Sequence, residues 1–123
     1  MEIAVDKLME LYVDTLQKCG MHLLNNSDED IEYFIFEEFD IGVISFLHEN
    51  SLHKLKKANL ITESISQKSQ LLRCKFMALE NTDLWNVVSV KSSQEWHEIL
   101  KLSDEIKLLI VDFHDPIRGI IVD

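Results

Sequence analysis

The nearest approach to a metal-binding motif in the sequence is HENSLH, in which Glu49 lies between His48 and His53. In the zinc-binding helix of metalloproteases, two histidines are four residues apart, so that both face one ion. Histidines five residues apart are turned by about 140° from each other on an α-helix. The other histidines are scattered, and neither Cys19 nor Cys74 has a second cysteine at CxxC spacing. The sequence therefore predicts no metal site.

Motifs for nucleophilic catalysis and phosphate binding are also missing. The sequence has no G-x-S-x-G elbow, and its three glycines are too far apart to form a phosphate-cradling loop. Cys19 falls on the apolar face of a predicted helix, where a thiol stays protonated and unreactive. Adjacent carboxylates such as Glu37 and Glu38 point about 100° apart on a helix, and nothing indicates a pocket around them. We therefore expect a protein that is not an enzyme and needs no cofactor.

The distribution of charge favours a basic protein as the binding partner. The net charge is −10, and residues 1–50 contain 12 acidic and 2 basic side chains, whereas residues 51–75 contain 1 acidic and 6 basic ones. An acidic surface repels nucleic-acid phosphates and attracts a basic protein. The basic block lacks the interleaved aromatic residues that stack on bases, so we expect it to balance neighbouring acids within the fold. It comprises Lys54, Lys56, Lys57, Lys68, Arg73 and Lys75.

Length and composition indicate one folded domain spanning residues 1–123, because 123 residues are enough for one core and 46% of them are apolar. The N-terminus lacks the pattern of a secretory signal, and no segment approaches the roughly 20 apolar residues that span a bilayer. Two cysteines suit a reducing compartment, and both are expected to be buried thiols. We therefore expect a cytoplasmic protein with no membrane contact.

A mainly α fold is predicted, because one proline and three glycines are too few for a turn-rich β protein. The expected architecture is a compact bundle of about five to six helices. Residues 2–19 have the apolar spacing of an amphipathic helix, and Gly20 is expected to end it in a left-handed conformation. Further helices are expected around residues 40–49, 49–61 and 62–81.

The segment from Asn25 to Asp40 is predicted to be a helix with two distinct faces. Ser27 is a good N-cap, and the acidic residues that follow it suit the first turn. At about 100° per residue, one arc faces the core and includes Glu38, and the opposite arc forms a candidate partner-binding surface. The core arc contains Ile31, Phe34, Ile35 and Phe39; the candidate surface contains Glu29, Glu32, Tyr33, Phe36, Glu37 and Asp40. Whether Tyr33 and Phe36 belong to an interface or to the core is open at this stage. A strand is less consistent with the segment, because Phe34 and Phe36 would fall on its polar face.

The last third of the chain offers one strand candidate at residues 84–90, LWNVVSV, although a buried helix has the same composition. Ser92 and Glu95 have capping-box spacing and predict a helix start. Ser103 is expected to cap a separate last helix over residues 104–113, and residues 117–122 are a second candidate for a short strand.

Three segments, FDIGVISFLHENSLHKLKKANLI, LLRCKFMALE and WHEILKLSDEIKLLI, resemble the small immunity proteins of bacterial contact-dependent growth inhibition systems. The resemblance extends over most of the chain and is one of overall character: an acidic single domain without a catalytic motif. It implies a one-to-one complex with the C-terminal domain of a cognate toxin, often a basic nuclease acting on tRNA or DNA. It also implies neutralisation by covering the active site or a substrate-binding surface. The alternative is an acidic regulatory or adaptor protein that binds a basic host protein without any toxin.

Overall fold

Helices form all the regular structure in residues 3–115, which are the residues that the computed structural model describes. They are α1 (Val5–Gln17), the 3₁₀-helix η1 (Met21–Asn25), α2 (Asp28–Ile31), the π-helix η2 (Glu32–Phe39), α3 (Asp40–Phe46), α4 (Glu49–Lys57), α5 (Glu63–Leu79), α6 (Val87–Ser92) and α7 (Gln94–His114). Because α2, η2 and α3 follow one another without a break, they form one continuous helix. The predicted mainly α bundle of five to six helices is confirmed.

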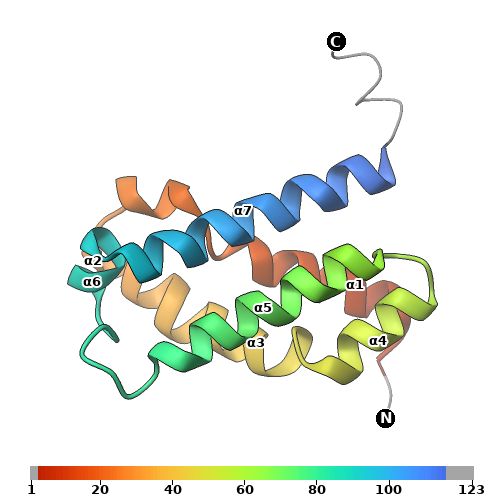
Figure 1. Cartoon of the computed structure of the whole chain (residues 1–123), viewed down its shortest axis with the longest axis horizontal. Helices are drawn as coiled ribbons and strands as arrows, with labels where there is room; N and C mark the ends of the chain where they lie inside the picture. The colour runs from red at the N-terminus through yellow and green to blue at the C-terminus, as the bar shows by residue number, and fades with distance from the viewer. Residues whose placement is uncertain (1–2, 116–123) are drawn as a thin grey trace.

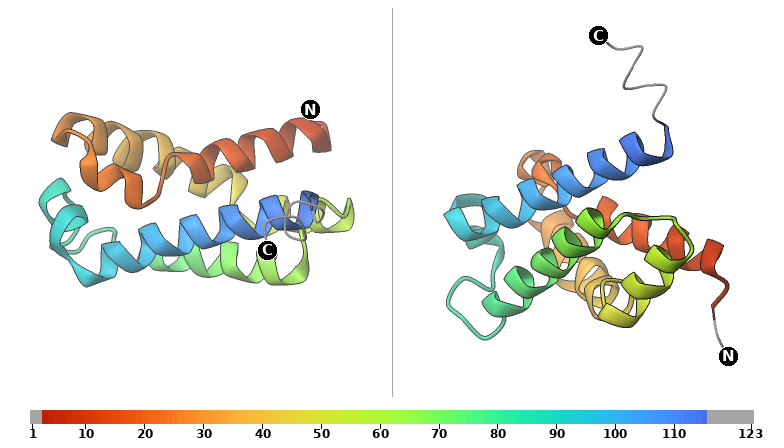
Figure 2. Two further views of the ribbon diagram at one scale, coloured as in Figure 1. Left: turned by 90° about the horizontal axis from the view of Figure 1, so that it is seen from above. Right: turned by 45° about the vertical axis from the view of Figure 1, so that its right-hand side comes forward.

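The helices are arranged in two layers (Figure 1, Figure 2). One layer contains α1 and the continuous helix, and the other contains α5 and α7, with α4 and α6 at opposite ends. The antiparallel α5 and α7 are joined by ion pairs between Lys68 and Glu105, at 2.9 Å, and between Lys75 and Glu98, at 3.5 Å. No helix in residues 3–115 is long and apolar enough to cross a membrane.

The strand alternative at residues 84–90 is wrong, because a side-chain cap starts a helix there. Asn86 has extended backbone angles, and its side-chain oxygen accepts a hydrogen bond of 2.8 Å from the Ser89 N–H. This is the geometry of an N-cap, and Val87–Ser92 follows as α6. β-branched composition was therefore outweighed by local capping. The other strand candidate, residues 117–122, lies outside the described residues.

The two serines predicted to start helices near α7 do not do so. Ser93, rather than Ser92, caps α7 by accepting from the Trp96 N–H at 3.2 Å. Ser103 lies in the middle of α7, which continues from Gln94 to His114. The buried hydroxyl of Ser103 donates instead to two carbonyl oxygens near the end of α1, Leu16 O at 3.1 Å and Cys19 O at 2.8 Å. Ser103, which was predicted to be an N-cap, therefore connects α7 to the end of α1.

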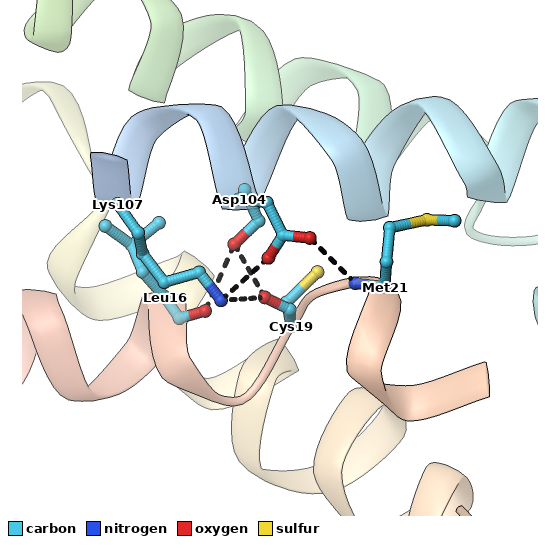
Figure 3. Close-up of polar contacts among 6 residues, drawn as sticks. Leu16, Cys19, Met21, Asp104 and Lys107 are labelled. Carbon is cyan, nitrogen blue, oxygen red and sulfur yellow. Dashed lines mark hydrogen bonds and ion pairs between the residues drawn. The ribbon is translucent and has the colours of Figure 1, made fainter. Parts of the chain in front are cut away.

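Two further side chains of α7 fix the chain as it leaves α1 (Figure 3). Lys107 Nζ donates to Cys19 O at 2.8 Å and pairs with Asp104 Oδ1 at 3.1 Å. Asp104 Oδ2 accepts from the Met21 N–H at 3.0 Å. These bonds satisfy backbone groups that the helix end would otherwise leave unpaired.

Gly20 is required at this turn for space rather than for a left-handed conformation. Its φ of 170° is extended, so the predicted left-handed end of the helix is wrong. A Cβ atom at this position would lie 2.4 Å from Asp104 Oδ1 and 2.9 Å from Lys107 Nζ. The neighbouring Cys19 is fully buried, and burial raises the pKa of its thiol to about 12. The prediction that both thiols are buried is wrong for Cys74, which is exposed on α5.

Gly42 of α3 allows the closest approach between the continuous helix and α1. A Cβ atom there would lie 2.3 Å from Thr15 Oγ1 and 2.4 Å from Thr15 Cγ2. The Thr15 hydroxyl donates to Leu11 O at 2.8 Å, which restrains the side chain. Gly42→Ala is therefore expected to destabilise the fold by about 1–3 kcal/mol in urea unfolding, despite a gain of about 1 kcal/mol in helix propensity.

The control for Gly42→Ala is the double variant with Thr15→Ala, which removes both of the closest contacting atoms. The two substitutions should compensate each other, with a coupling free energy of about 1 kcal/mol or more. Additive costs of the two single substitutions would contradict this account of the helix crossing.

Candidate protein-binding surface

The acidic segment contains a π-helix because its buried residues recur every four positions. Ile31, Ile35, Phe39, Val43 and Leu47 are all fully buried. Four residues of an α-helix advance by about 400°, so a stripe with this spacing would drift by roughly 40° at each step. The i→i+5 hydrogen bonds of a π-helix turn less per residue and offset that drift. The Asp40 N–H accordingly donates to Ile35 O, five residues earlier.

Because of the π-helix, Phe36 points inwards and does not belong to the exposed face. Its ring centroid lies 5.0 Å from that of Trp85 and 5.7 Å from that of Trp96, both edge to face. The prediction that Phe36 shares an outer face with Tyr33 is therefore wrong. A helical wheel drawn at about 100° per residue misplaces side chains wherever the helix is not an α-helix.

Tyr33, in contrast, lies on the surface, and the residue is 48% exposed. Its hydroxyl donates to Glu38 Oε1 at 2.7 Å, a contact between residues five apart that an α-helix would turn away from each other. The ring also contacts Phe34, with 5.5 Å between centroids. The hydrogen bond to Glu38, together with the charges of Glu38 and Glu37, raises the pKa of Tyr33.

Glu29, Glu32 and Glu37 are exposed, as predicted. None of the three forms an ion pair within residues 3–115. Among residues 3–115, the acidic segment forms one ion pair, between Asp28 and Lys91 of α6. We call the exposed group formed by Glu29, Glu32, Tyr33 and Glu37 the acidic face of the continuous helix. Its carboxylates are available to a basic partner.

Asp40 is half-buried, and the charged groups near it differ from those near Tyr33. Partial burial, followed by repulsion from Glu80 near the end of α5, raises its pKa. The charge of Glu37, in contrast, contributes to the raised pKa of Tyr33. The structure thus joins Tyr33 to Glu38 by a hydrogen bond, whereas Asp40 is close enough to Glu80 for the two carboxylates to repel each other.

Three of the six side chains of the basic block form ion pairs within the fold, in line with the expectation that the block balances neighbouring acids. Lys56 pairs with Glu63 at 2.6 Å, and Lys68 and Lys75 of α5 pair with the two glutamates of α7 described above. None of these pairs involves the acidic face. The basic block therefore leaves the negative charge of that face uncompensated.

Glu38 is a functional candidate that the helical wheel missed, because the wheel placed it among the core residues. In the structure it is half-buried and fixes the Tyr33 hydroxyl. Phe34 and Lys18 support the same site, with Lys18 Nζ lying 5.7 Å from the centroid of Phe34. Residues five apart, such as Tyr33 and Glu38, face each other on a π-helix but not on an α-helix. The sequence would therefore predict this contact only if the segment were taken to be π-helical.

The described residues contain no group of three or more His, Cys, Asp or Glu side chains that could hold a metal ion. Comparisons with protein-family models, curated proteins and solved structures found no match. Any proposal about function therefore depends on the charges and exposure of the acidic face.

Proposed function

We propose that the protein is a cytoplasmic immunity protein that neutralises the basic nuclease domain of a contact-dependent growth inhibition toxin. The observation that carries the proposal is the unequal pairing of charges. Three lysines of the basic block, Lys56, Lys68 and Lys75, are paired with glutamates of the fold. In contrast, Glu29, Glu32 and Glu37 are exposed and form no ion pair in residues 3–115. Exposed carboxylates of this kind steer a positively charged partner towards the surface that carries them.

Neutralisation would follow from competition for the same cationic groups. A nuclease presents Lys and Arg side chains to the phosphates of its substrate, and carboxylates form charge-assisted hydrogen bonds with those side chains. The acidic face, with Tyr33 as an exposed aromatic anchor, would cover the active site or a substrate-binding surface in a one-to-one complex.

The test uses the C-terminal domain encoded by the gene directly upstream of this one. Co-expression of the two chains should restore growth to cells poisoned by that domain, and the two should co-purify in equal amounts. The control is co-expression with the Glu32→Lys, Glu37→Lys variant, which should protect less well. Failure of the wild-type chain to bind the upstream domain would overturn the proposal, and recovery of a basic host protein instead would favour the adaptor alternative.

A further inference from the structure

Two neighbouring aromatic rings on η2 differ in whether a cation covers them. Lys18 Nζ of α1 lies 5.7 Å from the centroid of Phe34. Tyr33 contacts Phe34 in a T-shaped arrangement, and no Lys or Arg of residues 3–115 lies over the Tyr33 ring. The same aromatic pair therefore binds one cation within the molecule and leaves a second ring open to solvent.

The Tyr33 ring is well suited to bind a cation from a partner. Tyrosine, like phenylalanine, attracts a cation to the face of its ring, and Tyr33 is among the exposed large apolar residues of the chain. Glu38 accepts the Tyr33 hydroxyl, and Glu37 follows Tyr33 by four residues, about one turn of η2, so two carboxylates lie near the Tyr33 side chain. Their negative charge also raises the pKa of Tyr33. Attraction by the ring and attraction by the carboxylates therefore coincide at one position.

Tyr33 is also fixed before any partner arrives. Its hydroxyl is bonded to Glu38 Oε1 at 2.7 Å, and its ring contacts Phe34. The hydrogen bond joins residues i and i+5, so it depends on the π-helix, which in turn follows from the buried four-residue spacing. A side chain restrained at both ends loses less conformational entropy on binding.

We propose that Tyr33 and Glu37 bind an arginine side chain of the partner, with the guanidinium stacked on the Tyr33 ring and donating hydrogen bonds to the Glu37 carboxylate. Glu38 Oε1 already accepts from the Tyr33 hydroxyl, whereas Glu37 is exposed and forms no ion pair in residues 3–115. Glu37 is therefore the carboxylate assigned to the guanidinium. The identity of the partner in this inference rests on the proposed function. The inference adds that the Tyr33 position prefers arginine to lysine. A guanidinium is planar, stacks on aromatic rings and offers forked donors, whereas an ammonium is a compact and strongly hydrated charge.

The experiment is an NMR titration of the purified chain with acetyl-Gly-Arg-Gly-amide and, separately, with acetyl-Gly-Lys-Gly-amide. The arginine peptide should shift the Tyr33 ring resonances saturably, with a dissociation constant about fivefold or more below that of the lysine peptide. Tyr33→Leu should abolish the response, Glu37→Gln should weaken it, and Tyr33→Phe should retain most of it. The matched control is Phe113→Leu, which removes another exposed aromatic ring and should leave the titration unchanged.

Equal responses to the two peptides, or an unchanged response in Tyr33→Leu, would overturn the inference. Circular dichroism of each variant shows whether the fold is retained. The titration contains no toxin domain, so its result is separate from that of the neutralisation test. Arginine binding without neutralisation would remove only the proposed function, and neutralisation without arginine preference would remove only this inference.

Discussion

Replacing Phe76 by alanine is expected to lower the free energy of unfolding by about 3–5 kcal/mol, which is a large part of the roughly 5–15 kcal/mol typical of a domain. Phe76 is fully buried, and its ring centroid lies 4.9 Å from those of Phe39 and Trp85 and 5.8 Å from that of Trp96. Its loss would leave a cavity between α5, α7 and the continuous helix. Urea unfolding followed by tryptophan fluorescence measures the effect, because Trp85 and Trp96 both contact the substituted ring.

The matched control is Phe113→Ala near the end of α7, where the same substitution is made at a residue that is 40% exposed. Because this side chain keeps more of its apolar area in contact with water, the cost should be clearly smaller, about 1–2 kcal/mol. A cost for Phe76→Ala as small as that for Phe113→Ala would show that the aromatic cluster does not hold the layers together.

Reversing two charges of the acidic face, with Glu32→Lys and Glu37→Lys, is expected to slow association with the toxin domain by about ten- to a hundredfold at low ionic strength. The physical reason is that neither glutamate has an ion-pair partner in residues 3–115, so each contributes its full charge to steering. Stopped-flow fluorescence at low and high salt measures the rate constant, and the difference between the chains should shrink as salt screens the charges.

The control variant carries Asp6→Lys and Asp112→Lys, which change the net charge by the same amount at exposed positions in α1 and α7. Its association rate should stay close to that of the wild-type chain. If both double variants slowed association equally, net charge rather than the acidic face would be responsible. Thermal unfolding of both variants would show whether either substitution affects the fold.

Of the three serines predicted to cap helices, only Ser27 does so. Ser27 accepts from the Asp30 N–H at 3.2 Å, as its position before three acidic residues indicated. Ser103 was misread for an equally physical reason: a serine followed by acidic residues resembles a cap, but its hydroxyl is used across the helix interface. Sequence patterns show which local bonds a residue can make, and tertiary contacts decide which of them it makes.

The candidate surface was predicted in part. The exposure of Glu29, Glu32, Tyr33 and Glu37 follows from their polar character and from the apolar stripe opposite them. Phe36 and Glu38 were misplaced because the wheel assumed one helical period throughout. The sequence does contain a relevant signal, since buried apolar residues spaced four apart from Ile31 to Leu47 would drift by roughly 40° at each step on an α-helix. That signal does not specify which turns become π-helical, because this depends on the packing against α1, α5 and α7.

Cross-saturation NMR of the one-to-one complex tests the central claim most directly, since it identifies the amides of this chain that lie against the toxin domain. We predict that the largest losses of intensity fall within residues 29–37, with Tyr33 and Glu37 among them. Losses confined to the exposed sides of α5 and α7, with residues 29–37 unaffected, would contradict the account.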